Sequence, residues 1–215
     1  MDSSCRSRLT GLYIILDASV RSDRPLTEVL TASVQAGAGI FQYRNKLAPM
    51  KAAYVEALEL RKLAHRLGVL FIVNDRCDLA LAVDAEGVHL GQGDLPIELA
   101  RTVMGPDKLI GLSTHNPEQV ETAERLKPDY IGFGPIFQPG SKQDHDPVVG
   151  IEGLRAVRSR TSRPIFAIGG ITVKNAGEVM RAGASGIAVI SAILNAPDIK
   201  RTVSDFLAQM PTPAL

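Results

Sequence analysis

The sequence contains no tryptophan and few aromatic residues, which make up 5% of its 215 residues. Because single-stranded nucleic acids bind by stacking their bases on aromatic side chains, this scarcity argues against a stacking platform. The formal net charge is +1, so the chain also lacks the basic excess of a typical nucleic-acid-binding protein. We therefore expect no nucleic-acid partner.

Cysteine and long hydrophobic runs are also scarce. The two cysteines, Cys5 and Cys77, are isolated and indicate neither a disulfide framework nor a zinc site. No apolar run approaches the ~18 residues of a membrane-spanning helix, and the N-terminus lacks the apolar core of a signal peptide. These absences predict a cytoplasmic protein without a membrane partner.

Eight short apolar runs of β-strand type alternate with segments of helical spacing. The apolar runs lie at residues 12–16, 39–43, 70–73, 87–90, 109–112, 130–133, 165–168 and 186–190. The clearest helical segments lie at residues 26–38, 50–67, 117–126 and 173–182. This alternation predicts a parallel sheet whose outer face is covered by helices.

Eight such units predict an α/β fold, a single (β/α)8 or TIM barrel over residues 1–215 with ragged termini at about 1–9 and 210–215. An open, doubly wound sheet is the alternative, but the chain lacks a Gly-x-Gly-x-x-Gly turn. Active sites of TIM barrels lie on the loops that follow the strands. The residues after each predicted strand are therefore the functional candidates.

Asn74 and Asp75 follow the third predicted strand, and Asp94 follows the fourth. In a parallel sheet both turns lie at the same edge, so we expect the two carboxylates to lie side by side. Two converging carboxylates suit a hard cation such as Mg²⁺. The competing interpretation is structural, because Asp and Asn form turns and Asp94 could cap the helix that follows.

Gln42, Arg44 and Lys46 alternate after the second strand and therefore share one face of an extended chain. Such a face suits an anion, although solvated cations that balance nearby acids would have the same pattern. After the fifth strand, Asn116 is expected to cap a helix, which leaves Ser113 free to face the barrel mouth. His115 has no obvious acidic partner and is expected in the turn or at the surface.

Lys142 lies in the long loop after the sixth strand and could close over an anionic substrate, or could simply be exposed. Gly169 and Gly170 follow the seventh strand, and Ser191 follows the eighth. Exposed backbone N–H groups here would form the usual phosphate site of a TIM barrel, so one substrate should carry a monophosphate. A cation site beside cationic side chains suggests a diphosphate, and hence group transfer with pyrophosphate as the leaving group.

Several motifs occur in order, each after its own strand. They are Gln-x-Arg-x-Lys at 42–46, Asn-Asp-Arg at 74–76, Gly-Val-His-Leu-Gly-Gln-x-Asp at 87–94, Ile-Gly-Leu-Ser at 110–113, Asp-Tyr-Ile-Gly-x-Gly-Pro-Ile-Phe at 129–137, Ser-Lys at 141–142, Ile-Gly-Gly-Ile at 168–171 and Val-Ile-Ser at 189–191. Together they resemble the thiamine phosphate synthase family over nearly the whole chain, from Tyr13 to Ser191.

The resemblance implies two phosphorylated small-molecule substrates and Mg²⁺ held by Asp75 and Asp94. The residues that it assigns to the pyrimidine diphosphate are Gln42, Arg44, Lys46, Asn74, Ser113 and Lys142, of which Arg44, Ser113 and Lys142 would be catalytic. The residues that it assigns to the thiazole phosphate, or to its carboxylate form, are Pro139, Gly140, Ser141, Gly170, Ile190 and Ser191. A homo-oligomer is compatible with the sequence.

The products implied by the resemblance are thiamine phosphate and pyrophosphate, formed by a dissociative alkyl transfer. The aminopyrimidine would stabilise a positive charge on its methylene carbon, while Mg²⁺ and the cationic side chains stabilise the leaving pyrophosphate. The thiazole nitrogen would then add to the carbon, so no protein nucleophile is required.

Two positions depart from the family pattern. Pro139 stands where the family usually has threonine, and Asn45 stands where it commonly has an acid. Three alternatives remain at this point: a thiazole tautomerase-like paralogue, a non-catalytic regulatory or ligand-binding relative, and a phosphate-binding barrel of aromatic amino acid synthesis. The tautomerase-like paralogue generally lacks the metal aspartates, and the aromatic amino acid barrel would not need Asp75 together with Asp94. Pro139 is the only support for the non-catalytic relative.

Overall fold

The computed structural model describes residues 4–20, 24–138 and 146–210. Its strands are β1 (Gly11–Asp17), β2 (Ile40–Arg44), β3 (Leu70–Asn74), β4 (Gly87–Leu90), β5 (Leu109–Thr114), β6 (Tyr130–Phe133), β7 (Ile165–Ile168) and β8 (Gly186–Val189). All are parallel, each pairs with the next, and β8 pairs with β1 to close the barrel. The predicted (β/α)8 barrel is confirmed.

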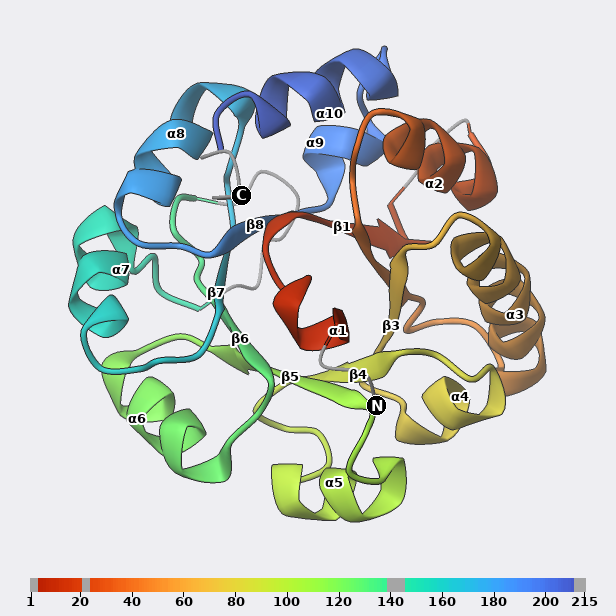
Figure 1. The fold of residues 1–215 in the computed structure, drawn as a ribbon, viewed down its shortest axis with the longest axis horizontal. Helices are drawn as coiled ribbons and strands as arrows, with labels where there is room; N and C mark the ends of the chain where they lie inside the picture. The colour runs from red at the N-terminus through yellow and green to blue at the C-terminus, as the bar shows by residue number, and fades with distance from the viewer. Residues whose placement is uncertain (1–3, 21–23, 139–145, 211–215) are drawn as a thin grey trace.

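The helices surround the strands as an outer ring, except for α1, which lies across the middle of the view (Figure 1). They are α1 (Ser4–Ser7), α2 (Leu26–Gln35), α3 (Met50–Arg66), α4 (Cys77–Ala82), α5 (Ile97–Met104), α6 (Pro117–Leu126), α7 (Gly150–Arg158), α8 (Val173–Arg181), α9 (Ser191–Leu194) and α10 (Ile199–Leu207). Among the described residues, none of these helices combines the length and apolarity that crossing a bilayer demands.

Both faces of the strands are buried, which explains the nearly continuous apolar runs in the sequence. On β1, Leu12 and Ile14 pack outward against the helices, whereas Tyr13 packs in the barrel interior with Tyr130 and Phe166. The Tyr13 and Phe166 rings meet edge to face, with centroids 5.2 Å apart. Side chains therefore fill the barrel, and its chemistry must lie at an open end of the strands.

The helix α1 was not among the elements expected from the sequence, and it lies at the amino ends of the strands. Its Arg6 Nε donates a hydrogen bond of 2.6 Å to Asp129, which directly precedes β6. Asp129 also accepts hydrogen bonds from Arg101 Nη2 at 2.7 Å and from the Ile110 N–H at 2.8 Å. The Asp129 side chain is only 6% exposed. Its three hydrogen bonds therefore join α1, α5 and β5 at the amino end of the barrel.

We expect Asp129→Ala to lower the free energy of unfolding by about 2–3 kcal/mol, because the Ile110 N–H and the partly buried Arg101 guanidinium would lose their acceptor, as would the exposed Arg6. Urea unfolding measures the loss. The control is Asp205→Asn. Asp205 is exposed, and its Oδ2 lies as far as 4.0 Å from Arg201 Nε, so the substitution should change the free energy of unfolding by no more than about 0.5 kcal/mol. Equal stabilities for Asp129→Ala and the control would contradict this assignment.

Candidate active site

Seven of the predicted site residues lie in or after the carboxyl-terminal parts of β2 to β5. They are Gln42, Arg44, Lys46, Asn74, Asp75, Asp94 and Ser113. The register of the barrel explains the grouping, since Asn74 is paired with His89 across β3 and β4. Residues that are distant in the sequence therefore meet at one rim of the barrel.

Asp75 and Asp94 lie next to each other, with Lys46 beside them. Asp75 has a φ of 63°, a left-handed conformation that aspartate and asparagine adopt more readily than most other residues. Its N–H donates to the His89 carbonyl at 2.8 Å, and its Oδ2 lies 3.0 Å from Lys46 Nζ. The turn therefore directs the Asp75 carboxylate toward Asp94.

The pKa of Asp94 is raised, first because the carboxyl is partly removed from water and then because the Asp75 carboxylate is adjacent. The Gly91 N–H, which donates to Asp94 Oδ2 at 2.7 Å, and the Lys46 ammonium oppose this shift in pKa. The pair thus carries negative charge that its protein neighbours compensate only in part. A divalent cation would complete that compensation.

The donor set fits magnesium rather than a metal with an all-protein shell. Within the described ranges, no group of three or more His, Cys, Asp or Glu side chains could hold a metal ion. Mg²⁺ is usually bound by one or two carboxylates and takes its remaining ligands from water and substrate phosphates. Asp75 and Asp94 match that pattern.

The interpretation of Asp94 as a helix cap is wrong. The helix α5 begins at Ile97, and the capping position is occupied by Pro96, which offers no side-chain hydrogen bond. Asp94 instead accepts the Gly91 N–H within its own turn. Asn116, by contrast, caps α6 as expected, because its side chain accepts the Gln119 N–H at 2.9 Å.

Arg44 is held in place by a neighbour that sequence reasoning missed. Asp17 ends β1 in register with Arg44 and forms an ion pair with its guanidinium. The Ser19 hydroxyl and N–H both donate to Asp17 Oδ1, at 2.6 and 2.9 Å. The Asp17 side chain is only 4% exposed and that of Arg44 only 15%, so Arg44 is not a freely solvated cation. The sequence signal for Asp17 was its position directly after the apolar run at residues 12–16.

A chain of buried and partly buried polar side chains connects Gln42 with Ser113 across the barrel interior. Gln42 Nε2 donates to the Tyr13 hydroxyl at 2.8 Å, and the hydroxyls of Tyr13 and Tyr130 are 2.9 Å apart. His89 Nδ1 lies 3.2 Å from the Tyr130 hydroxyl, and its Nε2 lies 3.0 Å from Ser113 Oγ. Sequence reasoning gave Tyr13, Tyr130 and His89 no role, although a histidine within an apolar strand is a recognisable signal.

Burial shifts the pKa values along this chain. Loss of hydration in the barrel lowers the pKa of His89 to about 4, against the opposing effect of the Asp75 carboxylate. The same loss of hydration raises the pKa values of Tyr13 and Tyr130 above their usual range. All three side chains are therefore neutral near neutral pH.

The turn after β7 is shaped by Gly169 and Gly170, with φ values of 97° and 63°. A Cβ atom at Gly170 would lie 2.7 Å from the Gln138 carbonyl oxygen, so only glycine fits. Asn175 Nδ2 donates to the Gly170 carbonyl at 3.1 Å, which braces the turn. Because β7 pairs with β8, this turn lies beside Ile190 and Ser191, the residues that follow β8.

Four predicted site residues lie outside the described residues: Pro139, Gly140, Ser141 and Lys142. The expectation that His115 lacks an acidic partner is wrong, because its Nε2 lies 3.5 Å from Asp146 Oδ2. Its Nδ1 is 2.7 Å from the Gly134 carbonyl oxygen, so this histidine braces the start of the loop after β6.

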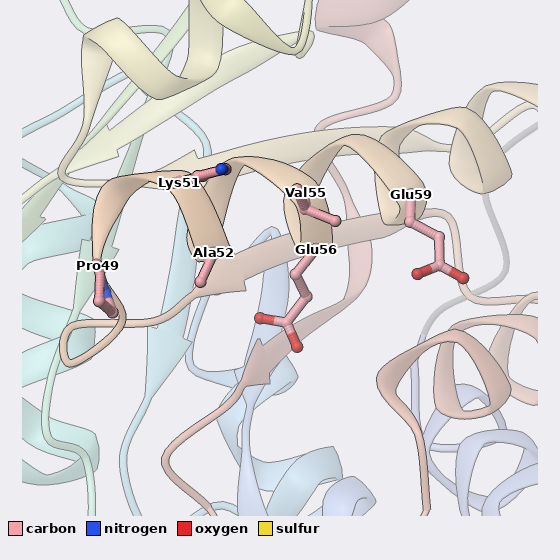
Figure 2. A pocket seen from close by; sticks show the side chains of 6 residues that line it. All are labelled: Pro49, Lys51, Ala52, Val55, Glu56 and Glu59. Carbon is pink, nitrogen blue, oxygen red and sulfur yellow. The ribbon is translucent and has the colours of Figure 1, made fainter.

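An open hollow of about 650 Å³ lies along α3 and contains none of the predicted site residues (Figure 2). Glu56 and Glu59 project from the same side of the helix (Figure 2). Glu56 accepts hydrogen bonds from the Tyr43 hydroxyl at 2.6 Å and from Asn45 Nδ2 at 3.2 Å. The asparagine at position 45 thus supplies a donor to Glu56, which an acid there could not do. Glu56 therefore holds the segment between Arg44 and Lys46 through Asn45.

Comparison with known proteins gives consistent results. A protein-family profile described as thiamine monophosphate synthase matches residues 12–193. The thiamine-phosphate synthase of Chloroflexus aurantiacus is 50% identical over 188 residues, 87% of each chain, and that of Pelotomaculum thermopropionicum is 47% identical over 91% of this chain and 94% of its own. The structure of thiamine phosphate pyrophosphorylase from Pyrococcus furiosus superposes with a TM-score of 0.85 at 37% identity and covers 95% of this chain and 96% of its own.

We expect Asp94→Asn to stabilise the metal-free protein at about pH 7. The pKa of Asp94 in the folded protein lies above its unfolded value, so ionisation destabilises the fold as the pH rises through the folded pKa. Asparagine still accepts the Gly91 N–H but carries no charge. Urea unfolding in EDTA should show the gain at about pH 7 and none at about pH 3, below the unfolded pKa, where both states are protonated.

Asp205→Asn is again the matched control, because it removes an exposed carboxylate distant from the pair. Lower stability of Asp94→Asn in EDTA at neutral pH would contradict the repulsion between Asp75 and Asp94. Addition of Mg²⁺ should stabilise the unmodified protein more than the Asp94→Asn variant.

Proposed function

Because the chain belongs to the thiamine monophosphate synthase family, we propose that the carboxyl end of its barrel joins a pyrimidine diphosphate to a thiazole phosphate. The chain is accordingly a transferase that makes thiamine phosphate and releases pyrophosphate. The observation that carries the proposed site is the convergence of Asp75, Asp94 and Lys46 beside Arg44. The curated relatives described above are synthases, which favours this activity over the tautomerase-like and regulatory alternatives.

The diphosphate of 4-amino-2-methyl-5-(diphosphooxymethyl)pyrimidine would lie between the carboxylate pair and the cationic side chains. Arg44 is already fixed by Asp17, so its guanidinium is preorganised for an anion. Lys46 is 55% exposed and paired with Asp75, so it can transfer to a phosphate oxygen when a cation takes the carboxylates. Asn74 and Ser113 complete this part of the rim, and Gln42 lies below them in the barrel interior. Lys142 joins them in the proposal from its family motif.

The cofactor that we propose is Mg²⁺, held by Asp75 and Asp94. When bound, it would neutralise charge on the departing pyrophosphate. The raised pKa of Asp94 supports this assignment, because two adjacent carboxylates with one lysine leave charge for a divalent cation.

The reaction needs neither a protein nucleophile nor a proton from the protein. The bond between the methylene carbon and the diphosphate oxygen breaks, and its electron pair leaves with pyrophosphate. The electron-rich aminopyrimidine stabilises the resulting carbocation, to which the thiazole nitrogen then donates its lone pair. Arg44, Lys46, Ser113 and Lys142 stabilise charge that grows on the leaving group.

The second substrate would place its phosphate at the turns after β7 and β8. Gly170 and Ser191 offer backbone N–H groups there, and Ile190 lies between the strand and α9. Pro139, Gly140 and Ser141 belong to this proposal through the family motif, with the serine hydroxyl as the polar group that remains. We also propose a cytoplasmic enzyme, which is consistent with the free thiols of Cys5 and Cys77.

We expect the purified protein to form thiamine phosphate and pyrophosphate in equal amounts, and only with Mg²⁺. Asp75→Asn should lower kcat by more than about 100-fold, because loss of several kcal/mol of metal assistance has that effect. Product analysis with and without EDTA measures both. Undiminished turnover of Asp75→Asn at limiting Mg²⁺ would remove Asp75 from the metal site, and absence of both products would refute the activity.

Asp17→Asn should raise KM for the pyrimidine diphosphate about tenfold, because Arg44 would lose the ion pair that positions it and about 1.4 kcal/mol of binding with it. Steady-state kinetics with saturating thiazole phosphate measures the change. Glu121→Gln is the control, since it removes an exposed carboxylate that pairs with Arg160, which lies between α7 and β7 at the amino end of the barrel. An unchanged KM in Asp17→Asn would show that Arg44 needs no such support.

A further inference from the structure

We propose that His89 is a positioning residue that fixes the direction of the Ser113 hydroxyl. The hydrogen-bonded chain from Gln42 through Tyr13 and Tyr130 holds the imidazole as the Nε2–H tautomer. His89 then donates to Ser113 Oγ, and the Ser113 hydrogen is left to point toward the leaving diphosphate. The role of that hydrogen rests on the proposed function, whereas the tautomer does not.

The direction of the chain follows from counting donors, beginning at Gln42. An amide nitrogen can only donate, so the Tyr13 hydroxyl accepts from Gln42 Nε2. Among the described residues, Tyr130 is the only other hydrogen-bond partner of this hydroxyl, so Tyr13 satisfies its own hydrogen by donating to Tyr130. Tyr130 must then donate to His89 Nδ1. A neutral imidazole with an accepting Nδ1 carries its proton on Nε2, which faces Ser113.

Burial fixes the direction of these hydrogen bonds. Tyr13 is 2% exposed and Tyr130 is fully buried, so neither hydroxyl can exchange its partner for water. An unsatisfied buried donor destabilises a fold, and reversing the chain would leave the Tyr13 hydrogen without an acceptor. Among the described residues, no side-chain atom of the chain is a buried polar atom without a partner.

Glycines in β5 and β6 leave room for the His89 and Tyr130 side chains. A Cβ atom at Gly111 would lie 2.5 Å from His89 Nδ1 and 2.2 Å from the Tyr130 ring, and one at Gly132 would lie 3.3 Å from His89 Cε1. Glycine weakens a strand because it adds conformational freedom to the unfolded chain and packs no side chain. These glycines therefore serve the placement of the imidazole, and the chain ends at Ser113 on the rim.

The first test observes the tautomer directly in the substrate-free protein. With ¹⁵N-labelled histidine, the nitrogen shifts of His89 should show an unprotonated Nδ1 and a protonated Nε2. His115 is an internal reference for a protonated Nδ1, because its Nδ1 faces the Gly134 carbonyl. His89→Gln assigns the resonance. A proton on Nδ1 of His89 would overturn the proposal whether or not the enzyme is active.

Tyr130→Phe tests the cause of the tautomer. Without the Tyr130 hydroxyl, Nδ1 loses its donor, and the population of the Nδ1–H tautomer should rise. Tyr54→Phe is the control, because Tyr54 is an exposed tyrosine of α3 and its substitution should leave the His89 shifts unchanged. An unchanged tautomer in Tyr130→Phe would contradict the role of the chain.

Kinetics then test whether His89 acts through Ser113. Ser113→Ala should lower kcat by about 100-fold with little change in KM, as loss of a donor to a developing anion does. His89→Leu should lower kcat by about tenfold in the presence of Ser113 and no further in its absence. His89→Gln, which keeps a donor, should restore part of the loss. Independent, multiplicative effects in the double variant would reduce His89 to a structural residue, and an inactive unmodified enzyme would refute the proposed function while leaving the tautomer test intact.

Discussion

Repulsion between two neighbouring carboxylates is the constraint on which the carboxyl end of the barrel depends. The parallel strands β3 and β4 deliver Asp75 and Asp94 to the same edge, and the left-handed turn at Asp75 directs one toward the other. Lys46 adds a positive charge at this pair, whereas Arg44, among the described residues, is bound to Asp17. The protein thus keeps an incompletely compensated pair of charges, which a cation and a diphosphate can complete together.

Polar groups have different roles at the two ends of the barrel. At the amino end, Asp129 is saturated by two arginines and a backbone N–H, and its role is to stabilise the fold. At the carboxyl end, the buried chain from Gln42 to His89 is also saturated, but it terminates on Ser113 at the open rim. Complete hydrogen bonding inside the barrel therefore gives direction to a hydroxyl outside it.

The eight strands could be predicted because both faces of each are buried and leave a continuous apolar pattern. The end of α2 was predicted beyond Gln35 because helical spacing continues past it, whereas Gly37 reverses the chain with a φ of 103°. The juxtaposition of Asp75 and Asp94 followed from parallel topology alone. Asp17 and the chain through His89 did not, since cross-strand register joins residues that no local pattern relates.

The most direct test of the central claim is a crystal structure with Mn²⁺ and pyrophosphate, in which anomalous scattering locates the metal. The account predicts one peak between the carboxylates of Asp75 and Asp94, at about 2.0–2.2 Å from an oxygen of each, with pyrophosphate oxygens completing the shell. Pyrophosphate bound by Arg44 and Lys46 without a metal peak between the two aspartates would contradict it.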